Sequence, residues 1–198
     1  HANWTVLVAF ILSVSLTFQT VAATNEDAFA AYKAGNYEQA LKIWRPLAEQ
    51  GDAVAQLRLS VMYAEGEGVA KDDAESLEWG QFAAEHGNVT AQLIMGARHN
   101  EGRGVPKDAS EAVKWFEKAA NKGAAYGQFN LGLIYAGNSG VPQDKVQSFK
   151  WFTLAAAIFP VSSKERDQAI YNANQVAAKM TPAEIAEAQR LAKEWKPE

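Results

Sequence analysis

The chain has 198 residues, of which 48% are hydrophobic and 11% aromatic, and this composition is sufficient for a hydrophobic core in one domain. It contains no cysteine, which excludes a disulfide scaffold and a lipid anchor on an N-terminal Cys. Nineteen basic and twenty-three acidic residues give a net charge of −4 without a block of like charges. The charge pattern therefore argues against a nucleic acid or an anionic membrane surface as the partner.

Residues 1–23 differ from the rest of the chain because they contain no Lys, Arg, Asp or Glu. Their apolar stretch, from Trp4 to Phe18, is shorter than the roughly 20 residues that a membrane-spanning helix needs. Small residues at Val21 and Ala23 are typical of a signal-peptidase site. We therefore expect a signal peptide that is cleaved near Ala23, giving a periplasmic or extracellular protein that does not span the membrane. An uncleaved N-terminal anchor is the alternative.

Residues 24–52 are expected to form an N-terminal capping hairpin. Gly35-Asn36-Tyr37 predicts a tight turn between two short helices. Ala48 and Gly51 stand 36 residues before Ala84 and Gly87, in phase with the sequence that follows.

A period of 36 residues organises the region 53–160, which divides into the units 53–88, 89–124 and 125–160. The units align without gaps, and a self-similar period of this length predicts a stacked array. Three aligned columns are assigned a structural role: the glycines Gly68, Gly104 and Gly140, the aspartates Asp72, Asp108 and Asp144, and the tryptophans Trp79, Trp115 and Trp151.

Each unit is predicted to be a hairpin of two helices. In the first helix of the first unit, Ala55, Leu59 and Met62 lie on one face. The aspartate column stands three residues before Glu or Gln, the spacing of a capping box at the start of the second helix. The tryptophan column lies on the buried face of that second helix and is predicted to be part of the core. Inside the first helix, position 60 becomes Gly96 in the next unit, which indicates that the paired helix approaches closely there.

Residues 161–198 are expected to form a helical cap. Pro160 ends the array, and Ser162 with Glu165 has the spacing of a capping box for one further helix. Thr181 and Glu184, with a proline between them, predict another helix start. These two helices would cover the exposed apolar face of the last repeat.

The repeated pattern A-Q-x-x-L/M-G-x-x-Y, G-x-G-V-P-x-D and A-x-x-W-x-x-x-A-A closely resembles the Sel1-like repeat, a relative of the tetratricopeptide repeat. The resemblance covers residues 53–160, and 24–52 resembles a shortened tetratricopeptide-like unit. The ending MTPAEIAEAQRLAKEW is similar to the closing helix of bacterial Sel1-repeat proteins. The resemblance implies an all-α fold, a right-handed α-α superhelix of helix hairpins with a C-terminal helical cap. It also implies a non-enzymatic adaptor for another protein, in envelope assembly or signalling.

Motifs for catalysis and for cofactor binding are missing from the sequence. We find no S-x-x-K, H-E-x-x-H, G-x-S-x-G or Walker-type loop. His86 and His99 are on different predicted helices without a companion Cys, so no metal site is expected. Glu65, Glu67 and Glu101 are expected to be solvated loop-edge charges rather than an acid-base pair. No catalytic residue, metal or cofactor is predicted.

Three columns of the first helix vary between units although their neighbours repeat. They are Arg58, Ile94 and Asn130; Met62, Arg98 and Ile134; and Glu65, Glu101 and Gly137. We predict that these columns contact a partner protein. Ordinary surface variation is the alternative interpretation.

Two rival functions remain. One is a cell-wall-active, penicillin-binding hydrolase, as in cysteine-rich Sel1-repeat proteins, although this chain lacks their cysteines. The other is a passive spacer.

Overall fold

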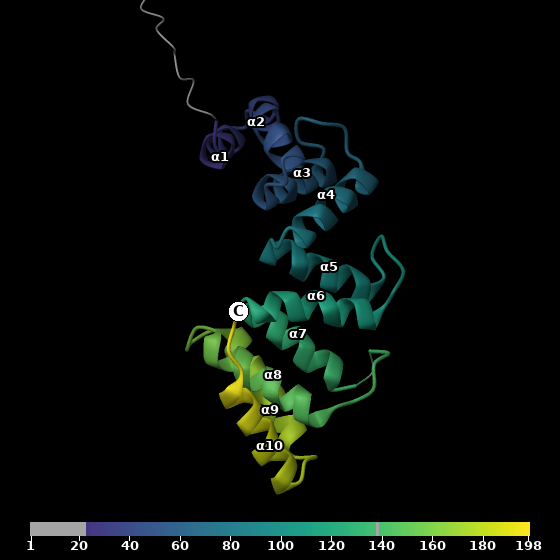
Figure 1. Cartoon of the computed structure of the whole chain (residues 1–198), viewed down its shortest axis with the longest axis vertical. Helices are drawn as coiled ribbons and strands as arrows, with labels where there is room; N and C mark the ends of the chain where they lie inside the picture. Colours follow the sequence, from purple (N-terminus) through teal and green to yellow (C-terminus); the bar gives the residue numbers. More distant parts are fainter. Residues whose placement is uncertain (1–22, 138) are drawn as a thin grey trace, which may run out of the picture.

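The computed structural model describes residues 23–137 and 139–198, and within them it forms ten α-helices and no β-strand (Figure 1). The predicted signal peptide falls almost entirely outside the described residues. None of the described helices has the length and hydropathy needed to cross a membrane. The helices are α1 (Asn25–Lys33), α2 (Tyr37–Glu49), α3 (Ala53–Glu65), α4 (Asp73–Glu85), α5 (Val89–Glu101), α6 (Ala109–Asn121), α7 (Ala125–Tyr135), α8 (Lys145–Ile158), α9 (Lys164–Ala177) and α10 (Pro182–Glu194).

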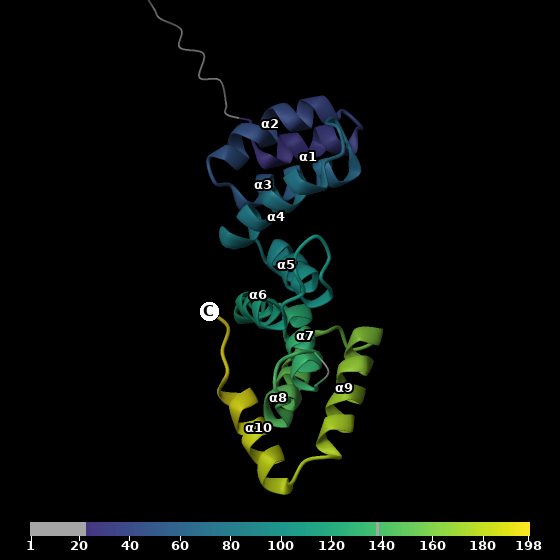
Figure 2. The same cartoon turned by 90° about the vertical axis from the view of Figure 1, so that its right-hand side faces the viewer.

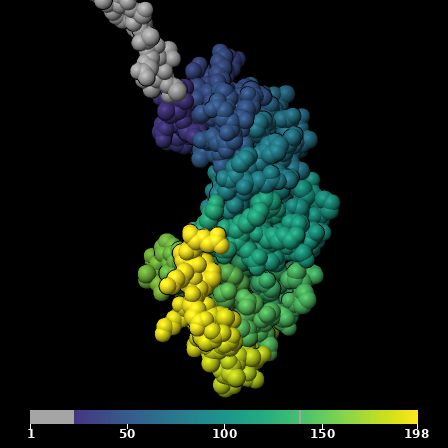
Figure 3. Space-filling view, viewed as in Figure 1, coloured from purple at the N-terminus to yellow at the C-terminus, as the bar shows by residue number. Residues whose placement is uncertain are grey.

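Consecutive helices pair as hairpins, and the hairpins stack in chain order along the long axis of the molecule (Figure 1). We call α3–α4, α5–α6 and α7–α8 repeats 1, 2 and 3; α1–α2 precedes them. At the other end α8 packs against both α9 and α10, which lie on either side of repeat 3 (Figure 2). The space-filling view shows an elongated, curved body (Figure 3). The all-α repeat architecture predicted from the sequence is therefore confirmed.

The second helix of each repeat begins at the predicted aspartate. Asp72 and Asp108 each accept hydrogen bonds from two backbone N–H groups of the first turn, and Asp144 accepts one from Gln147, at 2.9–3.1 Å. The reciprocal half of the predicted capping box is absent in repeat 1, because the Glu75 carboxylate instead accepts a hydrogen bond from the indole of Trp79. The aspartate satisfies two of the free N–H groups at the helix start in repeats 1 and 2, and one in repeat 3.

The glycines of the loops have left-handed backbone angles. Gly66 and Gly102 end α3 and α5 at φ of 75° and 76°. Gly68 is further constrained by packing, since a Cβ on it would lie 2.9 Å from the Cβ of Tyr37 in α2. The loop of repeat 1 therefore rests directly on the preceding hairpin. The two other glycines of this column, Gly104 and Gly140, also have positive φ.

The core consists of several clusters of buried side chains spaced along the stack. Trp44, Leu59 and Met62 are fully buried where α2 meets repeat 1. Trp115 and Trp151 are buried in repeats 2 and 3, whereas Trp79 is half-buried in repeat 1. The tryptophans of the column contribute to the core as predicted, and the least covered of them lies in repeat 1.

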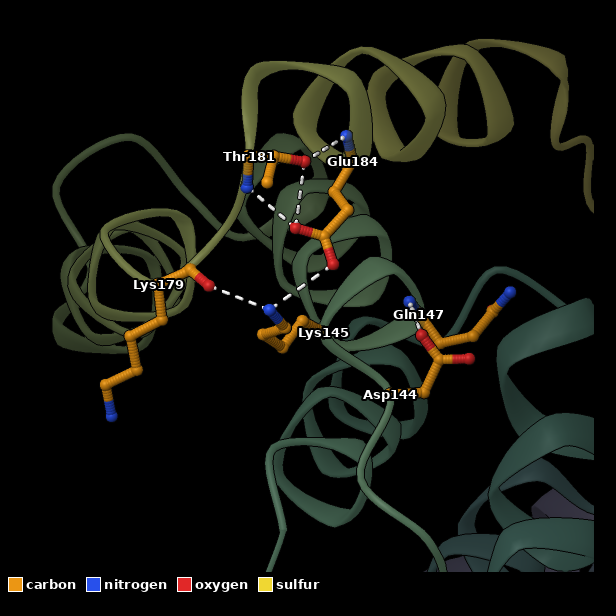
Figure 4. A network of polar contacts seen from close by, with 6 residues as sticks. All are labelled: Asp144, Lys145, Gln147, Lys179, Thr181 and Glu184. Carbon is orange, nitrogen blue, oxygen red and sulfur yellow. Dashed lines mark hydrogen bonds and ion pairs between the residues drawn. The ribbon is translucent and has the colours of Figure 1, made fainter.

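The C-terminal helices are held against repeat 3 by aromatic and polar contacts. Trp195 packs edge-on against Trp151, with ring centroids 6.0 Å apart. At the start of α8, Lys145 Nζ donates to the backbone carbonyl of Lys179 at 2.8 Å and lies 3.3 Å from Glu184 (Figure 4). Glu184 also completes the predicted capping box with Thr181. These contacts fix the turn between α9 and α10 on the last repeat.

The start of α9 differs by one residue from the prediction. Ser163, not Ser162, caps the helix, and its hydroxyl accepts the hydrogen bond from the backbone N–H of Arg166. The backbone N–H of Ser163 also donates to the carbonyl of Pro160, which closes a tight turn after α8. Adjacent serines offer the same cap chemistry, so the turn that follows α8 decides which of them is used.

Candidate functional site

A groove of about 700 Å³ lies at the junction of repeats 1 and 2. Its walls come from the first turns of α4 and from the second half of α5, the two helices that join these repeats in Figure 1. The end of α3 and the loop after α5 complete it. The lining residues are Ala64, Asp73, Ala74, Ser76, Leu77, Ile94, Ala97, Arg98, Arg103 and Gly104.

The groove contains an arginine at a position that is core in the other repeats. Arg98 is in phase with Met62 and Ile134, both of which are buried. Met62 belongs to the cluster shared with α2, and Ile134 packs in the cluster of repeats 2 and 3. A guanidinium group cannot be buried without a partner, so Arg98 extends to the surface of repeat 2. Its Nη1 lies 3.4 Å from the position of a Cβ on Gly104, over the loop glycine.

A second departure from the repeat pattern lies beneath the groove. Gly80 stands where repeats 2 and 3 have the buried Phe116 and Phe152. Ser60 fills part of the missing volume, and its hydroxyl donates to the backbone carbonyl of Ser76 at 2.6 Å. A small cavity of about 10 Å³ remains between Ser60, Gly80 and the neighbouring α5. The junction is thus packed with smaller side chains than its counterpart between repeats 2 and 3.

The charged groups of the groove differ in how they are paired. Arg103 Nε lies 2.5 Å from Glu101, in an ion pair whose two side chains are 67% and 49% exposed. Asp73 lies 3.9 Å from Lys71, and both side chains are largely exposed. Arg98 takes part in no ion pair with the residues that the structure describes. Its positive charge is therefore available to a ligand.

The remainder of the groove is apolar. Leu77 of α4 faces the groove opposite α5, from which Ile94 and Ala97 contribute. Ile94 is 39% exposed, which is high for a large aliphatic side chain in a repeat helix. Arginine is enriched at protein interfaces, and the buried centre of such interfaces is apolar.

The predicted partner-binding columns separate into distinct environments. Ile94 and Arg98 line the groove together, while Met62 and Ile134 are buried in the core and unavailable to a partner. That part of the prediction is wrong, because the column faces the preceding hairpin, where the apolar members Met62 and Ile134 are buried. The others lie outside the groove: Arg58 stacks on Phe29 at 4.8 Å, Asn130 donates to the carbonyl of Tyr126, Glu101 pairs with Arg103, Glu65 is exposed and Gly137 is in the loop after α7.

The sequence prediction missed the lining residues that come from outside the first helix, chiefly Leu77, Asp73 and Arg103. A signal was present in the aligned repeats, since Arg98 interrupts an apolar column and Gly80 interrupts a phenylalanine column. The two irregularities are eighteen residues apart, and only the fold brings them to one junction.

No group of three or more metal-binding side chains is present among the residues that the structure describes. His86 Nδ1 and Gln56 Oε1 are 2.9 Å apart at the end of α4, and His99 lies on α5. Outside the groove, burial raises the pKa of Glu117 and lowers that of Lys150. Neither Glu117 nor Lys150 lines the groove.

Two curated proteins are similar to a short part of this chain. Both are named exopolysaccharide production negative regulator, one from Rhizobium leguminosarum bv. viciae and one from Rhizobium meliloti (strain 1021), and they are 42% and 40% identical over 50 residues. This match covers 25% of the chain and 19% of each relative, so the chain spans less than a fifth of the length of these relatives.

Solved structures with the same repeat are also similar to this chain. The crystal structure of a Sel1 repeat protein from Oxalobacter formigenes is 33% identical, with a TM-score of 0.60 over 67% of this chain and 97% of that one. A protective antigen of uropathogenic Escherichia coli strains, described as displaying an SLR fold, is 26% identical, with a TM-score of 0.48 over 84% of this chain and 44% of that one.

The Sel1 repeat model matches four segments, residues 30–52, 53–88, 89–123 and 125–157, which together make up more than half of the chain. The first of these segments includes α2, so the hairpin before repeat 1 also carries the family signature. The chain belongs to the Sel1 repeat family.

Proposed function

We propose that this chain is a non-enzymatic scaffold that binds a partner protein through the groove between repeats 1 and 2. The observation that carries the proposal is the exchange of a core residue for Arg98, at the place where its counterparts Met62 and Ile134 are buried. This exchange removes apolar contacts from repeat 2 and leaves a partly buried cation unpaired, and both effects cost stability. Proteins keep residues that lower their stability at functional sites, and binding of a partner is such a function.

The rest of the groove supports a protein ligand. An exposed aliphatic side chain, Ile94, adjoins the guanidinium of Arg98 on a rigid helix, and Leu77 faces them from α4. Helical arrays of this kind hold such surfaces in fixed geometry, because each repeat is packed on its neighbours. A partner would therefore meet a preformed site and lose little of its binding energy to ordering the scaffold.

We further propose that the protein is exported, with cleavage near Ala23, and acts as an adaptor on a protein of the cell envelope. The structure of the first helix is compatible with that cleavage point. Thr24 caps α1 in a capping box with Asp27, and its backbone nitrogen donates to the Asp27 carboxylate at 2.9 Å. A new amino terminus at Thr24 would keep this contact as an ion pair. Two rhizobial relatives are named as negative regulators of exopolysaccharide production, and these names support a regulatory role.

Site-specific photocrosslinking tests the binding site directly. A photoreactive amino acid placed at Ile94 is expected to capture a discrete partner in cells that express the chain. The same amino acid at Val54 is the control, because Val54 has a similar exposure (45% against 39%) but lies outside the groove. Equal capture of the same protein at both positions would contradict the proposal. Absence of any captured protein at Ile94 would also contradict it.

A further inference from the structure

We infer that the groove between repeats 1 and 2 recognises an acidic segment of its partner: an extended stretch in which an Asp or Glu side chain stands close to an aliphatic side chain. The inference rests on the proposed function and adds the chemistry of the ligand to it. Its central interaction is between a side-chain carboxylate and the guanidinium of Arg98.

The charge balance of the groove points to an anion. Three charged side chains line the groove, Arg98, Arg103 and Asp73, and two of them have an ion-pair partner outside the lining. Lys71 is paired with Asp73 and Arg103 with Glu101, so Arg98 is the cation that remains. A guanidinium group has five N–H donors in a planar fork that matches the two oxygens of a carboxylate. Arg98 is held at the groove by α5 and crosses the loop glycine Gly104.

Arg103 supplies a second contact for the same ligand. Its ion pair with Glu101 is exposed on both sides, and exposed pairs contribute only about 0–1 kcal/mol. A ligand carboxylate can therefore replace Glu101 at little cost. Because Arg98 and Arg103 both line the groove, one acidic side chain or two successive ones can reach both guanidinium groups.

The apolar wall determines what stands beside the acidic residue. Leu77 and Ile94 line the groove together with Arg98, and the cavity beneath is shared by all three. Burial of an aliphatic ligand side chain there removes apolar surface from water on both molecules. A volume of about 700 Å³ is within the roughly 300–1,000 Å³ of ordinary ligand pockets and suits a short segment rather than a flat protein face.

The experiment is a selection of random twelve-residue peptides displayed within a surface loop of a carrier protein, so that no free carboxyl terminus is present. The full chain is the target. We expect enriched peptides to carry Asp or Glu within about four residues of Leu, Ile, Val or Met. Enrichment of peptides without an acidic residue would overturn the inference, and so would failure to obtain any peptide whose binding depends on Arg98.

Variants of the target separate the inference from the proposed function. Arg98→Met places in repeat 2 the residue that repeat 1 has at the same position, and is expected to weaken an enriched peptide at least about tenfold. Ile94→Asp is expected to abolish binding. Arg58→Met removes the same charge from outside the groove, where Arg58 stacks on Phe29, and is expected to leave the affinity unchanged.

Each pattern of results has one meaning. Loss of binding in Ile94→Asp with full binding in Arg98→Met would overturn the acidic ligand and leave the groove as a binding site. Full binding in both variants would overturn both proposals. A parallel selection of peptides with free carboxyl termini tests the other source of a carboxylate: stronger enrichment there, without Asp or Glu side chains, would contradict the inference of a side-chain ligand.

Discussion

Gly96 of α5 lies directly against the ring of Phe116 in α6, so closely that a Cβ on Gly96 would stand 2.6 Å from the ring. Gly132 and Phe152 repeat this contact in repeat 3 at 2.7 Å. In repeat 1 the relationship is inverted: the first helix carries Ser60 and the second carries the glycine, Gly80. Each hairpin therefore contains one small and one larger residue at this crossing, and the two positions vary as a pair. Close approach of the paired helix, predicted from glycine in a helix, is confirmed.

Gly96→Ala is expected to destabilise the protein by about 1–2 kcal/mol, because overpacking against the Phe116 ring outweighs the gain in helix propensity. Gly80→Ala is the matched control. Its new Cβ would lie 3.0 Å from the Ser60 hydroxyl, a smaller neighbour than an aromatic ring, so this variant should be close to neutral. Urea denaturation followed by circular dichroism measures both. Equal effects of the two substitutions would contradict the pairing.

Trp115→Ala is expected to lower the free energy of unfolding by about 3–5 kcal/mol, since it deletes a large side chain that is only 8% exposed. Trp79→Ala should cost less, because Trp79 is half-buried in repeat 1. Chemical denaturation of both variants gives the comparison. A larger loss for Trp79→Ala than for Trp115→Ala would refute this account of the core.

Arg98→Met is expected to increase the free energy of unfolding by about 1 kcal/mol, because it replaces an unpaired, half-buried cation by an apolar side chain that repeat 1 already buries. Thermal unfolding of the variant and the parent measures the gain. Arg58→Met is the control and should not stabilise, since it removes the contact with Phe29. A lower melting temperature for Arg98→Met would show that Arg98 serves the fold rather than a ligand.

Three glutamines in phase at the start of the first helices differ in their contacts. Gln56 and Gln92 donate to the carbonyls of Ala48 and Ala84 in the preceding helix, whereas neither side-chain atom of the fully buried Gln128 has a partner in the described structure. Gln92→Met should therefore cost about 1 kcal/mol, while Gln128→Met should be neutral or stabilising. Denaturant midpoints of the two variants test this order, and the reverse order would contradict it.

The hydroxyl of Tyr32 donates a hydrogen bond to Glu67, and this bond, together with burial and the nearby carboxylate charge, raises the pKa of Tyr32 to about 12. The folded state therefore binds the phenolic proton more tightly than the unfolded state, whose pKa is about 10. The stability from this contact is complete below pH 10 and is lost as the pH rises to about 12.

Tyr32→Phe tests this linkage. The variant should be less stable than the parent at pH 8. It should also lose less stability between pH 10 and pH 12, because residue 32 then has no phenolic proton to release. Urea midpoints measured across that range provide the slopes. Tyr171→Phe, which changes an exposed tyrosine, should keep the slope of the parent. Parallel curves for the parent and Tyr32→Phe would argue against the contact.

Much of the fold was predictable because its determinants are local in the chain. The spacing of Asp108 from the helix that follows, and of Trp115 within that helix, recurs every 36 residues and specifies where each hairpin begins and which face is buried. One-residue choices were less predictable. The cap of α9 is Ser163 rather than Ser162, because the turn closed on Pro160 decides between two chemically equal neighbours.

The candidate site was only half predictable. Variation between repeats identified the column of Met62, Arg98 and Ile134 but could not separate its core members from its surface member. That distinction depends on packing against the preceding hairpin, which this position faces: apolar side chains are buried there, whereas a guanidinium group without a partner extends toward solvent. The same holds for Leu77, whose place in the groove follows from the contact between two repeats.

The sequence by itself determined the period, the aspartate caps of the second helices and the family of this protein, because these depend on spacings of a few residues that repeat along the chain. The tertiary structure decided where the array has a usable surface. Arg98 and Gly80 are each a single departure from a column, and a groove forms because stacking places both at the same junction. Packing acts between helices rather than along them, so only the assembled repeats show which side chains remain exposed to a partner.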